Sequence, residues 1–153
     1  MTRHRAFHRT LALAVALAIP VMLTRGLAIS AASKDDYKII VNPDNPIVAI
    51  DRQFLRDAYL RKSTDWGNGG SIRPVDLRHG FAVRERFAQE VLRKSPSQLK
   101  SYWNQLIFSG KGVPPPEVDS TDAVIRYVLA NAGAVGYLPA DADPRAAKVV
   151  AVR

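Results

Sequence analysis

The chain of 153 residues contains no cysteine and very little histidine. Without cysteine it can form no disulfide, no thiolate nucleophile and no Cys-based zinc site, and it cannot carry a lipid on an N-terminal cysteine. His4 and His8 lie near the N-terminus, so only His79 remains for the rest of the chain. A Ser-His-Asp triad would have to use His79, and one subunit cannot build a multi-histidine metal centre. We therefore expect no enzyme of these common types, no cofactor and no metal.

The first 33 residues differ in kind from the rest. The opening "MTRHRAFHRT" carries three arginines and no acidic residue, and residues 11–23 form an apolar run interrupted only by Pro20. That run of 13 residues is shorter than the roughly 20 that a helix needs to cross a bilayer. Small residues follow, with a cleavage site after Ser30. We predict a signal peptide over residues 1–33, cleaved near residues 30–33; an uncleaved membrane anchor is the alternative.

Removal of this segment leaves residues 34–153, which suffice for one domain with its own core. Four of the 22 basic residues leave with the signal, so 18 basic residues face 14 acidic ones and the net charge falls from +8 to +4. The remaining chain has no long apolar run and no dense basic stripe. We therefore expect an exported protein, periplasmic or secreted, with no stable membrane insertion after signal removal and no nucleic-acid partner.

Strand and helix patterns alternate along residues 34–153. Apolar, β-branched segments predict strands over residues 37–43, 71–77, 133–139 and 146–152. Apolar residues at helical spacing predict helices after Asp51, after Gly80, after Ser95 and after Asp119 or Ser120. The order β-α-β-α-α-α-β-β indicates an α/β fold, a single layered domain. Pro74 restricts its strand to an edge or to a strand beginning.

The clearest helix follows Ser95. Ser95 and Gln98 form a capping box around Pro96 at the first helical position. One apolar face then repeats at helical spacing: Leu99, Tyr102, Trp103, Leu106 and Ile107. Tyr102 and Trp103 on this face are expected to lie in the core. Gly110 and Gly112 end the helix.

A second group of residues predicts close approaches in the fold. Trp66 lies in the turn "DWGNGG" and is expected to act as an aromatic lid over the core, with a ligand platform as the alternative. Gly133 and Gly136 lie in the predicted strand "GAVGYLP", at places where another backbone or a ligand could come near.

The stretch "PVDLRHGFAVRERF", residues 74–87, carries the candidate binding site. Arg78 precedes Gly80, and Arg84 lies in the first turn of the helix that follows. The unpaired N–H groups of a helix start attract anions. We therefore predict an anion site formed by Arg78, Gly80 and Arg84. The alternative is that these arginines are solvated, with Asp76 or Glu85 offsetting their unfavourable position.

Three segments together resemble a known family: "WGNGGSIRPVDLRHGFAVRERFAQEVL", "YWNQLIFSGKGVPPPEV" and "NAGAVGYLP". They are similar to small, single-domain members of the phosphate-type periplasmic substrate-binding protein superfamily of ABC transporters. The resemblance covers nearly all of residues 37–152. It implies a PBP-like domain over residues 34–153, like one lobe of a type II periplasmic binding protein. It also implies a protein that binds phosphate or another oxyanion in connection with ABC-type transport, and that is not an enzyme.

The helix-start motif differs from that of full-length relatives, which have Arg followed by Asp-Gly-Ser-Gly-Thr. Gly80 and Phe87 match the spacing, but residues 81–83, "FAV", replace the hydroxyl-bearing part. Arg78 is displaced by one position, and His79 stands where the family has Asp. This difference leaves a second function open, namely a non-catalytic module that binds an envelope protein partner and has kept the fold without the ligand.

Overall fold

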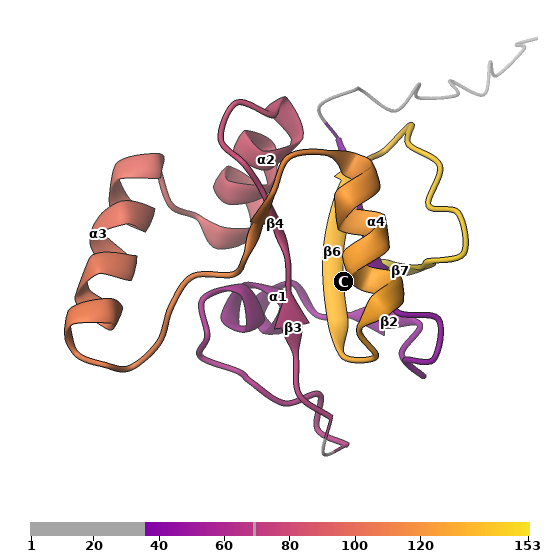
Figure 1. Cartoon of the computed structure of the whole chain (residues 1–153), viewed down its shortest axis with the longest axis horizontal. Helices are drawn as coiled ribbons and strands as arrows, with labels where there is room; N and C mark the ends of the chain where they lie inside the picture. The colour runs from indigo at the N-terminus through magenta and orange to yellow at the C-terminus, as the bar shows by residue number, and fades with distance from the viewer. Residues whose placement is uncertain (1–35, 69) are drawn as a thin grey trace, which may run out of the picture. The chain divides into compact units, whose positions relative to one another are not determined.

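The computed structural model describes residues 36–68 and 70–153 (Figure 1). The predicted signal peptide lies outside the described residues. The described residues all belong to one compact unit. Within the described ranges, no helix has the length and apolar character that crossing a membrane would require.

The described residues form an α/β fold, as predicted. The helices are α1 (Arg52–Tyr59), α2 (Ala82–Phe87), which continues into a π-helical turn (Ala88–Leu92), α3 (Pro96–Phe108) and α4 (Thr121–Ala130). The strands are β1 (Tyr37–Val41), β2 (Ala49–Ile50), β3 (Arg73–Pro74), β4 (Asp76–Leu77), β5 (Glu117–Val118), β6 (Ala134–Pro139) and β7 (Lys148–Val152). The short strands β2 and β5 were not expected, because each lies in a segment rich in proline or turn residues.

Five strands form the main sheet, in the order β2-β7-β1-β6-β3. Strand β1 pairs antiparallel with both β6 and β7, so that Ile39 lies between Tyr137 and Val150. Pro74 lies in edge strand β3, which confirms the expected position of this proline. After Pro74 the chain leaves the main sheet, and β4 pairs in parallel with β5 in a separate two-stranded sheet. The predicted strand over residues 71–77 is therefore two short strands.

Side-chain caps fix three helix starts, as the sequence indicates. Asp51 accepts hydrogen bonds from the backbone N–H groups at the start of α1, and Ser120 does the same for α4. Ser95 and Gln98 form the predicted capping box at α3. Each cap satisfies N–H groups that have no partner inside the helix, which is worth about 1 kcal/mol per helix.

An aromatic cluster joins α1, α2 and β6 in the core. Phe87 stacks on Tyr137 with ring centroids 4.1 Å apart, and Tyr59 packs on Phe87 at 4.8 Å. All three side chains are buried. Trp66 packs on Phe54 and donates from Nε1 to the carbonyl of Gly133 over 3.1 Å. The tryptophan is partly buried against the core, in agreement with the predicted lid.

Helix α3 departs from the expected packing. Figure 1 shows it at the periphery of the domain, away from the main sheet. Leu99 is its one buried residue, while Tyr102 and Trp103 are only partly buried against the core. Ile107, at the end of the same apolar face, is 47% exposed. The helical period was correct, but the body of the domain covers only the first half of the apolar face.

Gly133 and Gly136 lie where neighbouring groups come close, as the sequence predicted. A Cβ atom on Gly133 would lie 1.9 Å from the backbone oxygen of Ser71. A Cβ atom on Gly136 would lie 2.7 Å from a methyl group of Val124 on α4. Only glycine allows the turn before β6 to lie this near the chain that enters β3.

We predict that Gly133→Ala destabilises the domain by about 3 kcal/mol or more, because the backbone of Ser71 would have to move. Gly112→Ala is the matched control, since its Cβ would meet only Leu106 at 3.8 Å, an ordinary contact. Urea unfolding of both variants checks this. Equal midpoints for the two variants would contradict the packing described above.

Candidate functional site

The candidate site lies at the connection between β4 and α2. Gly80 has a φ of +100°, a conformation that favours glycine and lets the chain turn sharply into the helix. Phe81 is the N-cap residue and provides no side-chain hydrogen bond. The six-residue helix α2 then places Arg84 in its first turn, facing back toward β4.

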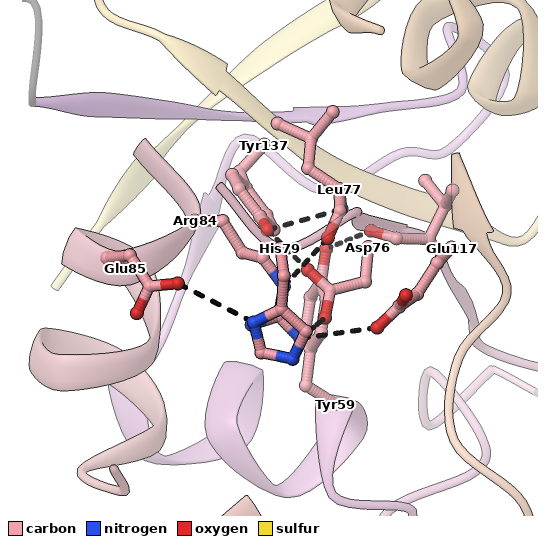
Figure 2. A network of polar contacts seen from close by, with 9 residues as sticks. Tyr59, Asp76, Leu77, His79, Arg84, Glu85, Glu117 and Tyr137 are labelled. Atoms are coloured by element: carbon pink, nitrogen blue, oxygen red, sulfur yellow. Dashed lines mark hydrogen bonds and ion pairs between the residues drawn. The ribbon is translucent and has the colours of Figure 1, made fainter. Parts of the chain in front are cut away.

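Arg84 is buried, and each of its three nitrogens has a partner from the same chain (Figure 2). Its Nε donates to the carbonyl of Leu77 over 2.7 Å, and its Nη1 donates to Nδ1 of His79 over 2.9 Å. Its Nη2 lies 3.3 Å from a carboxylate oxygen of Asp76 and 3.3 Å from one of Glu117. The side chain is 6% exposed, so the alternative that Arg84 is solvated is wrong.

Tyr137 holds the Asp76 carboxylate in place from below. Its hydroxyl donates to Oδ1 of Asp76 and accepts from the backbone N–H of Leu77 at 3.3 Å. The Tyr59 hydroxyl lies nearby and donates to the carbonyl of Val75 over 2.9 Å. Two buried phenols thus satisfy polar groups of Val75 and of β4.

Burial governs the ionisation of this cluster. It raises the pKa of the Asp76 carboxyl, and the neighbouring Arg84 guanidinium and Tyr137 hydroxyl only partly oppose that change. Burial also raises the pKa of Tyr137 well above its usual value, and the negative charge of Asp76 adds to this effect. Tyr137 therefore remains a protonated hydrogen-bond donor over the physiological range.

Glu117 and His79 close the outer side of the cluster. Glu117 comes from β5 and is 43% exposed, so it meets both Arg84 and solvent. His79 accepts the hydrogen bond from Arg84 on Nδ1, which makes Nδ1 the unprotonated ring nitrogen, and Glu85 lies 3.6 Å from the same atom. His79 thus orients Arg84 in this arrangement, which is a structural task.

A small cavity of about 110 Å³ adjoins this cluster. Asp76, Arg84 and Glu117 supply its charged wall. The rest of the lining is mainly apolar: Tyr59, Leu92, Leu99, Trp103, Pro114 and Pro115. Two carboxylates and one guanidinium give the wall a net charge of −1 when both acids are ionised, which repels an anion.

Arg78 lies in a different environment from Arg84. Its side chain is 63% exposed and forms an ion pair with Asp119, just after β5. Its backbone N–H bonds to the carbonyl of Val118. Neither Arg78 nor Gly80 lines the cavity beside Arg84. Anion binding by Arg78, Gly80 and Arg84 stays a prediction, and the structure gives both arginines carboxylate partners of their own.

Sequence reasoning missed most of the network around Arg84. It named Asp76 as a group that could offset an arginine, and the structure pairs Asp76 with Arg84. It gave no role to Tyr137 or Glu117, which lie far along the chain and reach the site only through β6 and the β4-β5 pair. Among the described side chains, no group of three or more His, Cys, Asp or Glu residues could hold a metal ion.

Comparison by sequence finds no relatives. No protein-family model matches the chain, and no curated protein sequence matches it significantly.

Comparison by structure does find similar folds. A protein described as a phosphate ABC transporter substrate-binding protein with bound phosphate, from Clostridium perfringens, matches 76% of this chain at 22% identity and a TM-score of 0.60. An ABC-type phosphate transport receptor from Vibrio cholerae matches 76% at 20% identity and a TM-score of 0.62. PstS from Borrelia burgdorferi matches 76% at 12% identity and a TM-score of 0.57.

These matches cover 44%, 45% and 47% of the three longer proteins. The chain therefore spans less than half the length of the proteins that share its fold. At these identities the similarity concerns the fold alone. The resemblance expected from the sequence is confirmed at that level: the chain has the α/β fold of phosphate-type substrate-binding proteins, over about the extent of one lobe.

Proposed function

We propose that this protein is a non-catalytic interaction domain of the cell envelope. It has the fold of a solute-binding lobe but does not bind a free anion. The single observation that carries the proposal is the state of Arg84. Its guanidinium is 6% exposed and fully engaged by Leu77, His79 and two carboxylates. A ligand would have to displace those partners, whose rearrangement inside the protein is costly.

The surroundings of Arg84 support the same conclusion. The cavity wall carries one more negative than positive charge, and Phe81 gives the helix start no hydroxyl that could bind an oxyanion. The domain is therefore expected to act through its surface, on another component of the envelope.

Phosphate or oxyanion binding in connection with ABC-type transport is the second candidate. It is favoured by the fold, which is shared with proteins described as phosphate-binding, one of them with phosphate bound. The two candidates differ in one measurable property, namely whether the isolated domain takes up a small anion.

Calorimetry of residues 34–153 with phosphate and with sulfate separates the candidates. We expect no saturable heat at millimolar ligand, because Arg84 and Arg78 are already neutralised within the chain. Saturable binding that is lost in Arg78→Gln and kept in the exposed control Arg126→Gln would establish the second candidate and reject the first.

Unfolding measurements test the structural role of Arg84. Arg84→Met is expected to cost about 3–5 kcal/mol, because it leaves Asp76, whose side chain is only 13% exposed, without its cation. Arg78→Met is expected to cost less than about 1 kcal/mol, since the pair with Asp119 is exposed. Adding Asp76→Asn to Arg84→Met should recover part of the loss. Similar small losses for both single variants would mean that Arg84 is not held by its own chain in solution.

A further inference from the structure

The net charge of residues 34–153 lies in one segment. Between Glu90 and Glu117 the chain has no acidic residue, and it carries four basic ones, Arg93, Lys94, Lys100 and Lys111. The other residues of 34–153 contain 14 basic and 14 acidic side chains, so their charges cancel. The whole excess of +4 therefore belongs to α3 and its flanking turns.

The same segment carries exposed apolar side chains at one end. Phe108 is 89% exposed, Val113 is 62% exposed and Ile107 is 47% exposed. Lys100 precedes Ile107 by seven residues, two helical turns, so the two share a face of α3. Lys111 lies between Phe108 and Val113 in the turn that follows. Apolar and cationic groups are thus combined on one outward surface, which we call the α3 tip (Lys100 and residues 107–113).

Backbone bonds hold the α3 tip in shape. The N–H groups of Gly110 and Lys111 donate to the carbonyls of Ile107 and Leu106 over 3.0 and 2.9 Å, respectively. The Ser109 hydroxyl also donates to Leu106, over 3.1 Å. These bonds satisfy carbonyls that would otherwise be unpaired at the helix end. The tip presents Phe108 on a closed turn at the end of a helix that Figure 1 shows at the edge of the domain.

The α3 tip lies outside the hollow beside its helix. That hollow includes none of the three exposed apolar residues of the tip. It is lined instead by mainly polar side chains from the start and middle of α3 and the turn before it: Lys94, Ser97, Gln98, Ser101, Tyr102 and Gln105. A protruding apolar side chain needs a partner that can form around it. Lipid chains do so without a preformed pocket, and anionic headgroups attract the flanking lysines.

We propose that the α3 tip seats the domain on an anionic membrane surface, with Phe108, Ile107 and Val113 in the interface and Lys100 and Lys111 against the headgroups. The contact is peripheral and does not require a spanning segment. Charge complementarity selects a bilayer that contains acidic lipid over a neutral one. This inference goes beyond the proposed function and does not depend on whether the domain binds an oxyanion.

Vesicle flotation tests the proposal on residues 34–153, a part of the chain that contains every residue of the core cluster. Leaving out residues 1–33 removes the apolar run that would itself bind lipid. The probes are phosphatidylcholine vesicles with and without one-third phosphatidylglycerol. We expect binding to the anionic vesicles to exceed binding to the neutral ones by about tenfold or more, and to weaken in high salt.

Two matched double variants locate the contact. Ile107→Ser with Phe108→Ser should reduce binding to anionic vesicles by about tenfold or more, because it removes the inserted groups. Val48→Ser with Val149→Ser is the control, since these side chains are 73% and 48% exposed elsewhere on the surface, and it should bind as the unaltered protein does. Lys100→Gln with Lys111→Gln should lower binding, while Lys62→Gln should not.

Three outcomes would overturn the proposal. One is equal binding to neutral and anionic vesicles, and another is full binding by the Ile107 and Phe108 variant. The third is the absence of lipid binding in a protein that self-associates through the α3 tip, seen as a dimer in light scattering that the same variant abolishes. Because the substituted side chains lie outside the core, unchanged circular dichroism is expected to exclude unfolding as the cause.

Discussion

The arrangement of β4, α2 and β5 depends on the burial of one guanidinium, that of Arg84. Removing Arg84 from water costs several kcal/mol unless its donors and its charge are matched. The match comes from two neighbouring strands: the carbonyl of Leu77 and the carboxylate of Asp76 on β4, and the carboxylate of Glu117 on β5. The chain leaves the main sheet after Pro74, and β4 then pairs with β5. This pairing places Glu117 beside Asp76, although the two residues are 41 positions apart in the sequence. The small second sheet therefore brings both carboxylates next to the buried Arg84.

The charged network and the aromatic core share one residue. Tyr137 stacks on Phe87 of α2 through its ring and orients Asp76 through its hydroxyl. Rotation of α2 that would expose Arg84 to a ligand would also disturb this stack, which contributes about 1 kcal/mol beyond the burial of the two rings. The resting arrangement is therefore stabilised twice, once by electrostatics and once by packing. This coupling explains why Arg84, in the first turn of α2, stays bound to partners from its own chain.

Most of the helices and strands could be predicted from local patterns in the sequence. The apolar, β-branched run of β1 and the capping box of Ser95 and Gln98 depend on neighbouring residues, and both were predicted correctly. The site could not be predicted in the same way, because Arg84, Glu117 and Tyr137 meet only after the strands have paired. Periodicity also could not show how far along α3 the body of the domain reaches. It identified a correct apolar face, and Ile107 lies on the part of it that nothing in the described chain covers.

The distribution of charge connects these two findings. Inside the domain, Arg84 is offset by acids, and within residues 34–153 the charges outside residues 91–116 sum to zero. The uncompensated cations lie on α3 and its flanking turns, where apolar side chains are also left in water. Both features cost free energy in an isolated domain, since like charges repel and exposed apolar surface is poorly hydrated. A partner with negative charge and an apolar interior relieves both at once, and a lipid surface has both properties in the same place.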